Sequence, residues 1–233
     1  MKALVRKLLP TGLWLHLRAL KDKPRSTYYA DVYGSGLSRN HPHFSDNRKL
    51  LLAGKIPADV ARLVPLIPGQ RILEIGAGEG ILSLALARDG RQKVYSLDVT
   101  PVRHEAAKML RDAWLAAGAV TEDQTHLVLG DVFEHLNLLR DIDTVVASRV
   151  IYYFHDRIDE LFAEVGTSAK HVALVGNAER ALWWRMGKRD SLGEFAYYAT
   201  VEGMTELLRR HGYEITFTDS KRGKDPVVVG QRV

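Results

Sequence analysis

The fold is decided by the stretch Ile72-Leu73-Glu74-Ile75-Gly76-Ala77-Gly78-Glu79-Gly80, where a mainly apolar run leads directly into three glycines at alternate positions. An apolar run of this length is typical of a short buried strand, here over residues 71–75. Glycine enters tight turns at little steric cost and lets a ligand approach the backbone closely. The stretch therefore predicts a strand that ends in a ligand-binding turn, followed by a helix over residues 81–88.

Strands and helices alternate through the rest of the chain. After a helix over residues 58–63 and the strand and helix above, we expect strands over residues 93–97, 126–129, 144–147 and 171–175 and helices over residues 101–117 and 156–165. Thr100 is expected to cap the helix that starts at Pro101. This alternation predicts βαβ units and a parallel sheet.

The C-terminal part differs in its connections. Thr200 is expected to cap a helix over residues 201–211, which Gly212 ends. Two strands follow, over residues 213–218 and 227–233, joined by the polar turn SKRGKDP. Because this connection is too short for a helical crossover, the two strands are predicted to form an antiparallel hairpin.

Two acidic residues follow successive predicted strands. Asp98 ends the second strand, eighteen residues beyond Gly80, and Gly130-Asp131 comes directly after the third. The carboxyl ends of parallel strands meet at one edge of a sheet, where α/β proteins bind their ligands. Asp98 is placed there to accept hydrogen bonds from ribose hydroxyls.

With these motifs, residues 50–233 resemble the class I S-adenosylmethionine-dependent methyltransferases. The resemblance implies an α/β fold with a Rossmann-like, doubly wound seven-stranded sheet, mostly parallel with an antiparallel last strand, and S-adenosyl-L-methionine as the cofactor. In that family the turn E/D-x-G-x-G-x-G holds the methionine part, the acid after strand two holds the ribose, and the acid after strand three faces the adenine amino group. The cofactor contacts expected here are the matching residues and their neighbours: Glu74, Gly76, Ala77, Gly78, Gly80, Asp98, Val99, Asp131, Val132 and Ser148.

A nicotinamide or flavin dehydrogenase is the competing interpretation. Its fingerprint is G-x-G-x-x-G with an acid about twenty residues further on. Here the glycines are spaced G-x-G-x-G, and an acid stands two residues before the first. The spacing therefore favours the methyltransferase.

Composition limits the chemistry. The chain of 233 residues has no cysteine, which excludes disulfides, thiolate metal sites and cysteine nucleophiles and fits a cytoplasmic location. Its net charge of +5 is concentrated near the N-terminus, because residues 1–25 contain seven Lys and Arg but one Asp. The remainder is close to neutral, which disfavours nucleic acid as a partner. An RNA methyltransferase that uses the basic N-terminal tail is the alternative.

The first 47 residues are predicted to form a unit of their own, with an amphipathic helix over residues 13–20 and a lid segment over residues 25–47, before the methyltransferase domain of residues 48–233. The helix either packs on the domain or in a homodimer, or lies on an anionic membrane surface through residues 1–25. In the second case the protein is cytoplasmic and peripheral to the inner face of a membrane.

The acceptor is predicted to be a small molecule that is methylated on oxygen or nitrogen, without a metal. After the fourth strand, residues 147–156 resemble the segment where small-molecule members carry a V-L-H-H-like stretch, with tyrosine at both central places. Tyr152 and His155 are the predicted catalytic residues; the other candidate bases are His41, His43 and Glu179. The stretch ALWWRMGKR, residues 181–189, is either a grip for an anionic or glycan-like acceptor or a basic helix that packs through its tryptophans.

Overall fold

The computed structural model describes residue 51 and residues 54–187, 192–221 and 223–233. Seven strands form one sheet in the order β3-β2-β1-β4-β5-β7-β6. Their bounds are β1 Arg71–Ile75, β2 Lys93–Asp98, β3 Thr125–Leu129, β4 Thr144–Ser148, β5 His171–Val175, β6 Tyr213–Asp219 and β7 Val227–Arg232. The predicted amphipathic helix and lid lie outside the described residues.

The predicted strand directions are confirmed. β1 pairs in parallel with β2 and with β4, and the outer pairs β2–β3 and β4–β5 are parallel as well. β7 runs antiparallel to both β5 and β6, so the last two strands form the expected hairpin. The strand order reverses between β1 and β4, which makes that gap the place for a ligand at the carboxyl edge.

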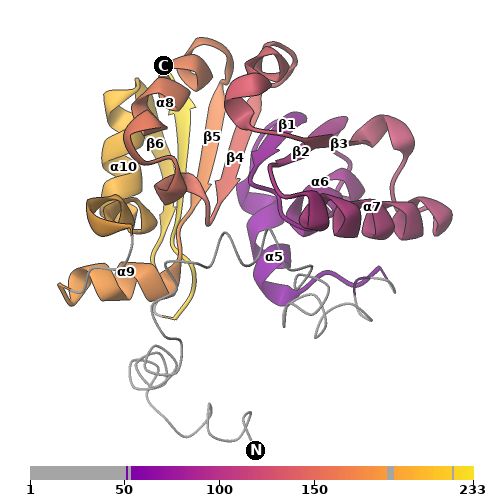
Figure 1. Ribbon diagram of the computed structural model, residues 1–233, viewed down its shortest axis with the longest axis horizontal. Coiled ribbons are helices and arrows are strands. Elements are labelled where there is room, and N and C mark those ends of the chain that lie inside the picture. Colours follow the sequence, from indigo (N-terminus) through magenta and orange to yellow (C-terminus); the bar gives the residue numbers. More distant parts are fainter. Residues whose placement is uncertain (1–50, 52–53, 188–191, 222) are drawn as a thin grey trace, which may run out of the picture.

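Six α-helices among the described residues complete the layers. They are α5 Ala58–Leu63, α6 Ile81–Arg88, α7 Pro101–Ala116, α8 Ile158–Ser168, α9 Ala178–Arg185 and α10 Val201–Arg210. Helices α6 and α7 lie beside β1, β2 and β3, whereas α8 and α10 lie beside β4, β5 and β6 (Figure 1).

Each face of the sheet has its own hydrophobic cluster because side chains alternate along a strand. From β1, Ile72 packs with α6 and α7, whereas Leu73 and Ile75 pack with α8 and α10. Glu74 therefore faces the α6 side, in a mainly apolar layer. The sheet is doubly wound, as the sequence predicts.

The two predicted helix caps have different outcomes. The Thr200 hydroxyl oxygen accepts a hydrogen bond from the Gly203 N–H at 3.0 Å, so this cap is confirmed. The prediction for Thr100 is wrong, because its side chain makes no capping hydrogen bond to α7. Its backbone N–H instead donates to Asp98. Among the described residues, no helix is both long and apolar enough to cross a membrane.

Candidate functional site

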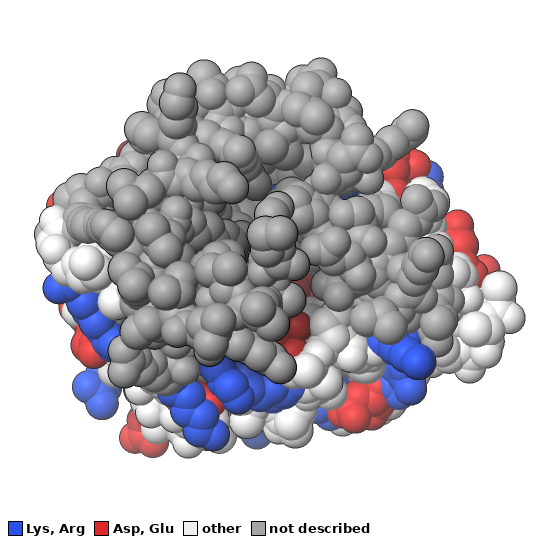
Figure 2. Space-filling view, turned by 90° about the horizontal axis from the view of Figure 1, so that it is seen from below, with Lys and Arg blue, Asp and Glu red and all other residues white. Residues whose placement is uncertain are grey.

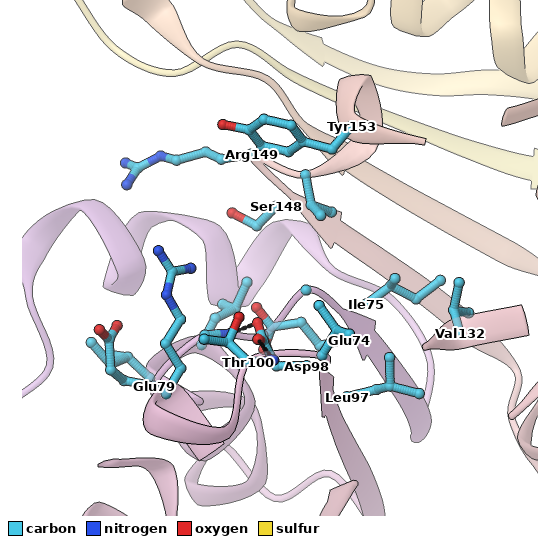
Figure 3. Close-up of a pocket in the computed structure, with 18 of the residues that line it drawn as sticks. Glu74, Ile75, Glu79, Leu97, Asp98, Thr100, Val132, Ser148, Arg149 and Tyr153 are labelled. Carbon is cyan, nitrogen blue, oxygen red and sulfur yellow. Dashed lines mark hydrogen bonds between the residues drawn. The ribbon is translucent and has the colours of Figure 1, made fainter. Parts of the chain in front are cut away.

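The carboxyl ends of β1, β2, β3 and β4 border one cavity of about 670 Å³. It lies beside the reversal of strand order between β1 and β4, as expected for a doubly wound sheet. Figure 3 shows Ser148, Arg149 and Tyr153, from β4 and the segment after it, across the cavity from Asp98 and Thr100. The cavity therefore has one wall from the first three strands and one from the segment after β4.

Most of the predicted cofactor residues are brought together here. Those that line the cavity are Glu74, Gly76, Ala77, Gly78, Asp98, Val99, Asp131, Val132 and Ser148. Gly80 is not in the lining; with φ 68° it is the residue that precedes α6. The geometry gives Gly80 a role in turning the chain, and its contact with the cofactor stays a prediction.

Gly76 brings the two walls of the cavity into contact. Its φ is +69°, a conformation that favours glycine. A Cβ at this position would lie 2.5 Å from Cγ2 of Val150, in the segment after β4. No side chain fits between the glycine turn and that segment, so glycine is required by both conformation and space.

Asp98 holds the glycine turn in place. Its Oδ2 accepts the Gly78 N–H at 2.8 Å, and its Oδ1 accepts the Thr100 N–H at 2.8 Å. The residue is buried, and these two hydrogen bonds satisfy part of each carboxylate oxygen. Since each oxygen of a carboxylate has a further lone pair, hydroxyl groups in the cavity can still donate to Asp98. This geometry fits a ribose.

Glu74 lies behind the turn, on the face covered by α6. The Ser83 hydroxyl donates to its Oε2 at 2.5 Å. Burial raises the pKa of Glu74 from 4.5 to about 7, because it outweighs the lowering effect of the Ser83 hydrogen bonds, and the negative charge of Asp98 raises it further. This carboxyl group is therefore partly protonated near neutral pH.

Asp131 follows β3 and is exposed at the cavity edge. Its Oδ1 accepts the Phe133 N–H at 3.0 Å and so caps the short 3-10 helix η4, Val132–Glu134. The other carboxylate oxygen is left for a donor such as an amino group, while Val132 is buried against the hydrophobic core.

The two predicted catalytic residues line the same cavity, but Tyr152 is buried and His155 is exposed. Tyr152 is 1% exposed, and burial, followed by the effect of Tyr153, raises the pKa of its phenol far above the ordinary value. It therefore stays protonated and is suited to donating a hydrogen bond rather than accepting a proton. His155 is exposed, and its ring packs edge-on against Phe195 with the centroids 5.0 Å apart. His155 is the better placed proton acceptor of the two, and both roles stay predictions.

The other candidate bases do not join the site. Glu179 lies on α9 and is not part of the cavity lining. His41 and His43 lie outside the described residues. Within the parts of the chain that the structure describes, no group of three or more His, Asp or Glu side chains is arranged to hold a metal.

The stretch after β5 packs through one of its tryptophans. Trp184, on α9, contacts the core and lies 5.3 Å from Tyr197 between ring centroids. Arg180 reaches back toward the cavity, where Nη2 donates to the Tyr153 hydroxyl at 3.1 Å. Its guanidinium also lies 5.0 Å from the centroid of the Tyr152 ring. Packing by Trp184 is therefore confirmed, and acceptor binding by this stretch stays a prediction.

The lining also contains polar residues that the sequence prediction did not include, among them Asp59, Arg149 and Asn177. Arg149 and Asn177 follow the ends of β4 and β5, so the rule that selects Asp98 and Asp131 also points to them. Asp59 lies in α5, before the first strand, and no sequence signal places it at this edge.

Comparison with known proteins agrees with this geometry. Residues 47–217 match the model of a family described as a methyltransferase domain. An uncharacterised methyltransferase of Geobacillus sp. is 26% identical over 182 residues, which cover 69% of this chain and 77% of that protein.

Solved structures give the same fold. The magnesium protoporphyrin IX methyltransferase of Synechocystis PCC 6803, crystallised with bound S-adenosylmethionine, has a TM-score of 0.56 and 16% identity. The match covers 91% of this chain and 98% of that protein. At this identity the likeness concerns the fold alone.

Proposed function

Because this chain belongs to the class I S-adenosylmethionine-dependent methyltransferases, we propose that it transfers a methyl group to an oxygen or nitrogen atom of a small-molecule acceptor. The observation that carries the proposal is the two-walled cavity. One wall, from the glycine turn to Asp131, has the donors and acceptors for a nucleoside with an amino acid tail. The other wall, from Ser148 to His155, remains for the acceptor.

The residues of the first wall fit S-adenosylmethionine. Gly76 and Gly78 leave the backbone open, Asp98 would bind the ribose hydroxyls, and Asp131 would accept from the adenine amino group. When bound, this cofactor supplies a sulfonium methyl group that is already electrophilic. The chain therefore has to align the acceptor with that methyl group and, for a hydroxyl acceptor, to remove a proton.

His155 is proposed as the group that takes the proton. It is exposed at the cavity edge, so it can exchange protons with water between turnovers. Tyr152, held in its protonated form, would orient the acceptor as a hydrogen-bond donor.

The acceptor is proposed to be a saccharide or a lipid-linked intermediate. We propose a cytoplasmic protein that contacts the inner face of a membrane through residues 1–25.

Calorimetry on the purified protein tests the cofactor site. S-adenosylmethionine and S-adenosylhomocysteine should bind, NADH should not, and Asp98→Ala should weaken both affinities at least tenfold, because it removes the ribose partner and the bond to Gly78. Asp112→Ala, on an exposed side of α7, is the control and should bind as the wild type does. Heat on addition of NADH, with none from S-adenosylhomocysteine, would refute the proposal.

A cell extract with labelled S-adenosylmethionine tests the acceptor class. Label is expected in a small-molecule fraction, on oxygen or nitrogen. Label confined to RNA would contradict the small-molecule assignment.

A further inference from the structure

Two residues after β4 adopt a costly backbone conformation. Among the described residues, Arg149 and His155 are the non-glycine residues with positive φ, at 59° and 50°. Both line the cavity on its acceptor side. For residues with a Cβ, this conformation costs roughly 1 kcal/mol or more and persists where surrounding contacts impose it, often at functional sites. Arg149 was not among the residues that the sequence singled out.

Contacts from three other segments hold Arg149. Its Nε donates to Asp225 Oδ2 at 2.6 Å, and its Nη2 pairs with the same oxygen. Nη2 also lies 3.5 Å from Asp59 Oδ2, and the Arg149 backbone N–H donates to Val175 O at 2.7 Å. The guanidinium thus joins α5, the end of β4 and the turn between β6 and β7.

Asp225 is the fixed end of this arrangement. Its Oδ1 accepts the Ala178 N–H at the start of α9 at 2.9 Å, and its backbone oxygen accepts from Arg62 Nη2 at 3.0 Å. The side chain of Asp225 is 16% exposed, compared with 44% for Arg149 and 63% for Asp59. Asp225 is therefore the buried residue that holds the Arg149 guanidinium in place. Arg149 and Asp59 are the two residues of this cluster that line the cavity.

The remaining hydrogen-bonding capacity is mixed. Nη1 of Arg149 has two N–H groups without a hydrogen-bond partner among the described residues, and the Asp59 carboxylate is an acceptor beside them. Two neighbouring hydroxyl groups of a ligand fit this arrangement, because one can accept from Nη1 of Arg149 while the other donates to Asp59. Tyr153, next in the lining, adds an aromatic face with a polar tip.

Charge distinguishes between classes of acceptor. The positive charge of Arg149 is already matched by Asp225 and Asp59, so a carboxylate or phosphate on the acceptor would be repelled by those two acids. A wholly apolar acceptor would remove water from the charged pair without replacing its hydrogen bonds. A neutral molecule rich in hydroxyl groups avoids both costs.

We propose that Arg149 and Asp59 bind a neutral, polyhydroxylated acceptor of the saccharide type through two neighbouring hydroxyls, with Asp225 as the residue that positions Arg149. This inference rests on the proposed function, because it places the acceptor beside the methyl donor in the same cavity. Asp59 and Arg149 are acceptor-specificity residues, and Asp225 acts through Arg149.

The test uses the full chain saturated with S-adenosylhomocysteine. Binding is followed by saturation-transfer NMR with the methyl pyranosides of glucose, galactose, mannose and rhamnose, and with glucuronate and galacturonate as anionic counterparts. At least one neutral glycoside should bind, and the uronates should bind at least tenfold more weakly. Among small diols, trans-1,2-cyclohexanediol should compete with that glycoside, and cyclohexanol should not.

Variants separate recognition from folding. Arg149→Lys and Asp225→Asn should each weaken glycoside binding at least tenfold. In Asp225→Asn the side-chain oxygen can still accept from the Ala178 N–H, but the charge that pairs with Arg149 is lost. If Asp225 served only to hold α9, this variant would bind the glycoside as the wild type does. Arg157→Lys is the matched control, because Arg157 makes a two-pronged pair with Glu160 outside the cavity lining and its loss should change nothing. The affinity for S-adenosylhomocysteine should stay near the wild-type value in all three, which shows that each variant is folded.

The outcomes are distinct. Failure to bind S-adenosylhomocysteine would remove the proposed function itself. Normal binding of S-adenosylhomocysteine would leave that function standing but overturn this inference if no glycoside bound, if the uronates bound more tightly, or if Arg149→Lys had no effect.

Discussion

Glu74 is a carboxyl group on a buried strand, and it also lines the polar cavity. It lies on β1 between apolar neighbours, and the Ser83 hydroxyl donates a hydrogen bond to its carboxylate. Burial therefore raises its pKa to about 7, and the folded protein binds this proton more tightly than the unfolded chain does. The stability contributed by the protonated group is lost as the pH rises from about 4.5 through 7.

The variant Glu74→Gln is predicted to remove this pH dependence. Relative to the variant, the wild type should lose up to about 3 kcal/mol of unfolding free energy between pH 4.5 and pH 8, since one pKa unit corresponds to about 1.4 kcal/mol. Urea unfolding at four pH values measures it. Glu105→Gln, on an exposed side chain of α7, should keep the wild-type slope. An unchanged slope in Glu74→Gln would show that the pKa of Glu74 is not raised in the folded protein.

At the scale of elements, the glycine turn between β1 and α6 decides where the cavity lies. Gly76 adopts a positive φ and contacts Val150 across the cavity, so the turn from β1 and the segment after β4 are packed directly against each other. Elsewhere in the chain, Gly90 follows α6 with a φ of +93°, but no atom lies within 4 Å of the Cβ position. The two glycines share the conformational requirement and differ in the available space.

Alanine at these two positions should separate the two effects. Gly90→Ala is expected to cost about 1 kcal/mol, from backbone strain alone. Gly76→Ala should cost about 1–3 kcal/mol more, because Val150 has to move, and should weaken S-adenosylhomocysteine binding at least tenfold. Denaturant unfolding and calorimetry measure the two quantities. Equal losses of stability in both variants would show that Val150 moves freely.

At the scale of the whole molecule, charge is divided unevenly. Residues 1–25 hold most of the positive excess, and the remainder is nearly neutral. Figure 2 shows blue and red side chains side by side on the described part of the visible face, rather than a field of one sign. Attraction to an anionic surface is therefore expected to depend on the N-terminal residues.

Deletion of residues 1–25 is predicted to abolish binding to phosphatidylglycerol vesicles while leaving the affinity for S-adenosylhomocysteine unchanged. Each basic residue near an anionic membrane contributes about 1 kcal/mol, so the excess in this segment is sufficient for peripheral binding. Co-sedimentation of the full and the shortened chain measures it. Equal sedimentation of both chains would exclude a membrane role for this segment, and steeply salt-dependent RNA binding by the full chain would favour the RNA alternative.

The sequence by itself determined the strand order along the chain, the hairpin, the glycine turn and the acids at successive strand ends. It also determined the α-helices of the described residues except α9, because a helix was only one of two interpretations of residues 181–189. These features depend on periodicity, on glycine conformation and on the rule that parallel strands end at one edge, all of which can be recognised within short stretches. Thr200 as a helix cap belongs to the same class, since its partner is three residues away.

Only the tertiary structure decided which distant side chains meet. Arg149 and Asp225 are separated by 76 residues, and their contact depends on how the β6–β7 turn packs against the end of β4. The raised pKa of Glu74 also depends on the layer that covers it. Thr100 also stands directly before α7, as the sequence predicts, but its side chain makes no capping hydrogen bond there. Such contacts arise from the packing of whole elements, which no local pattern encodes.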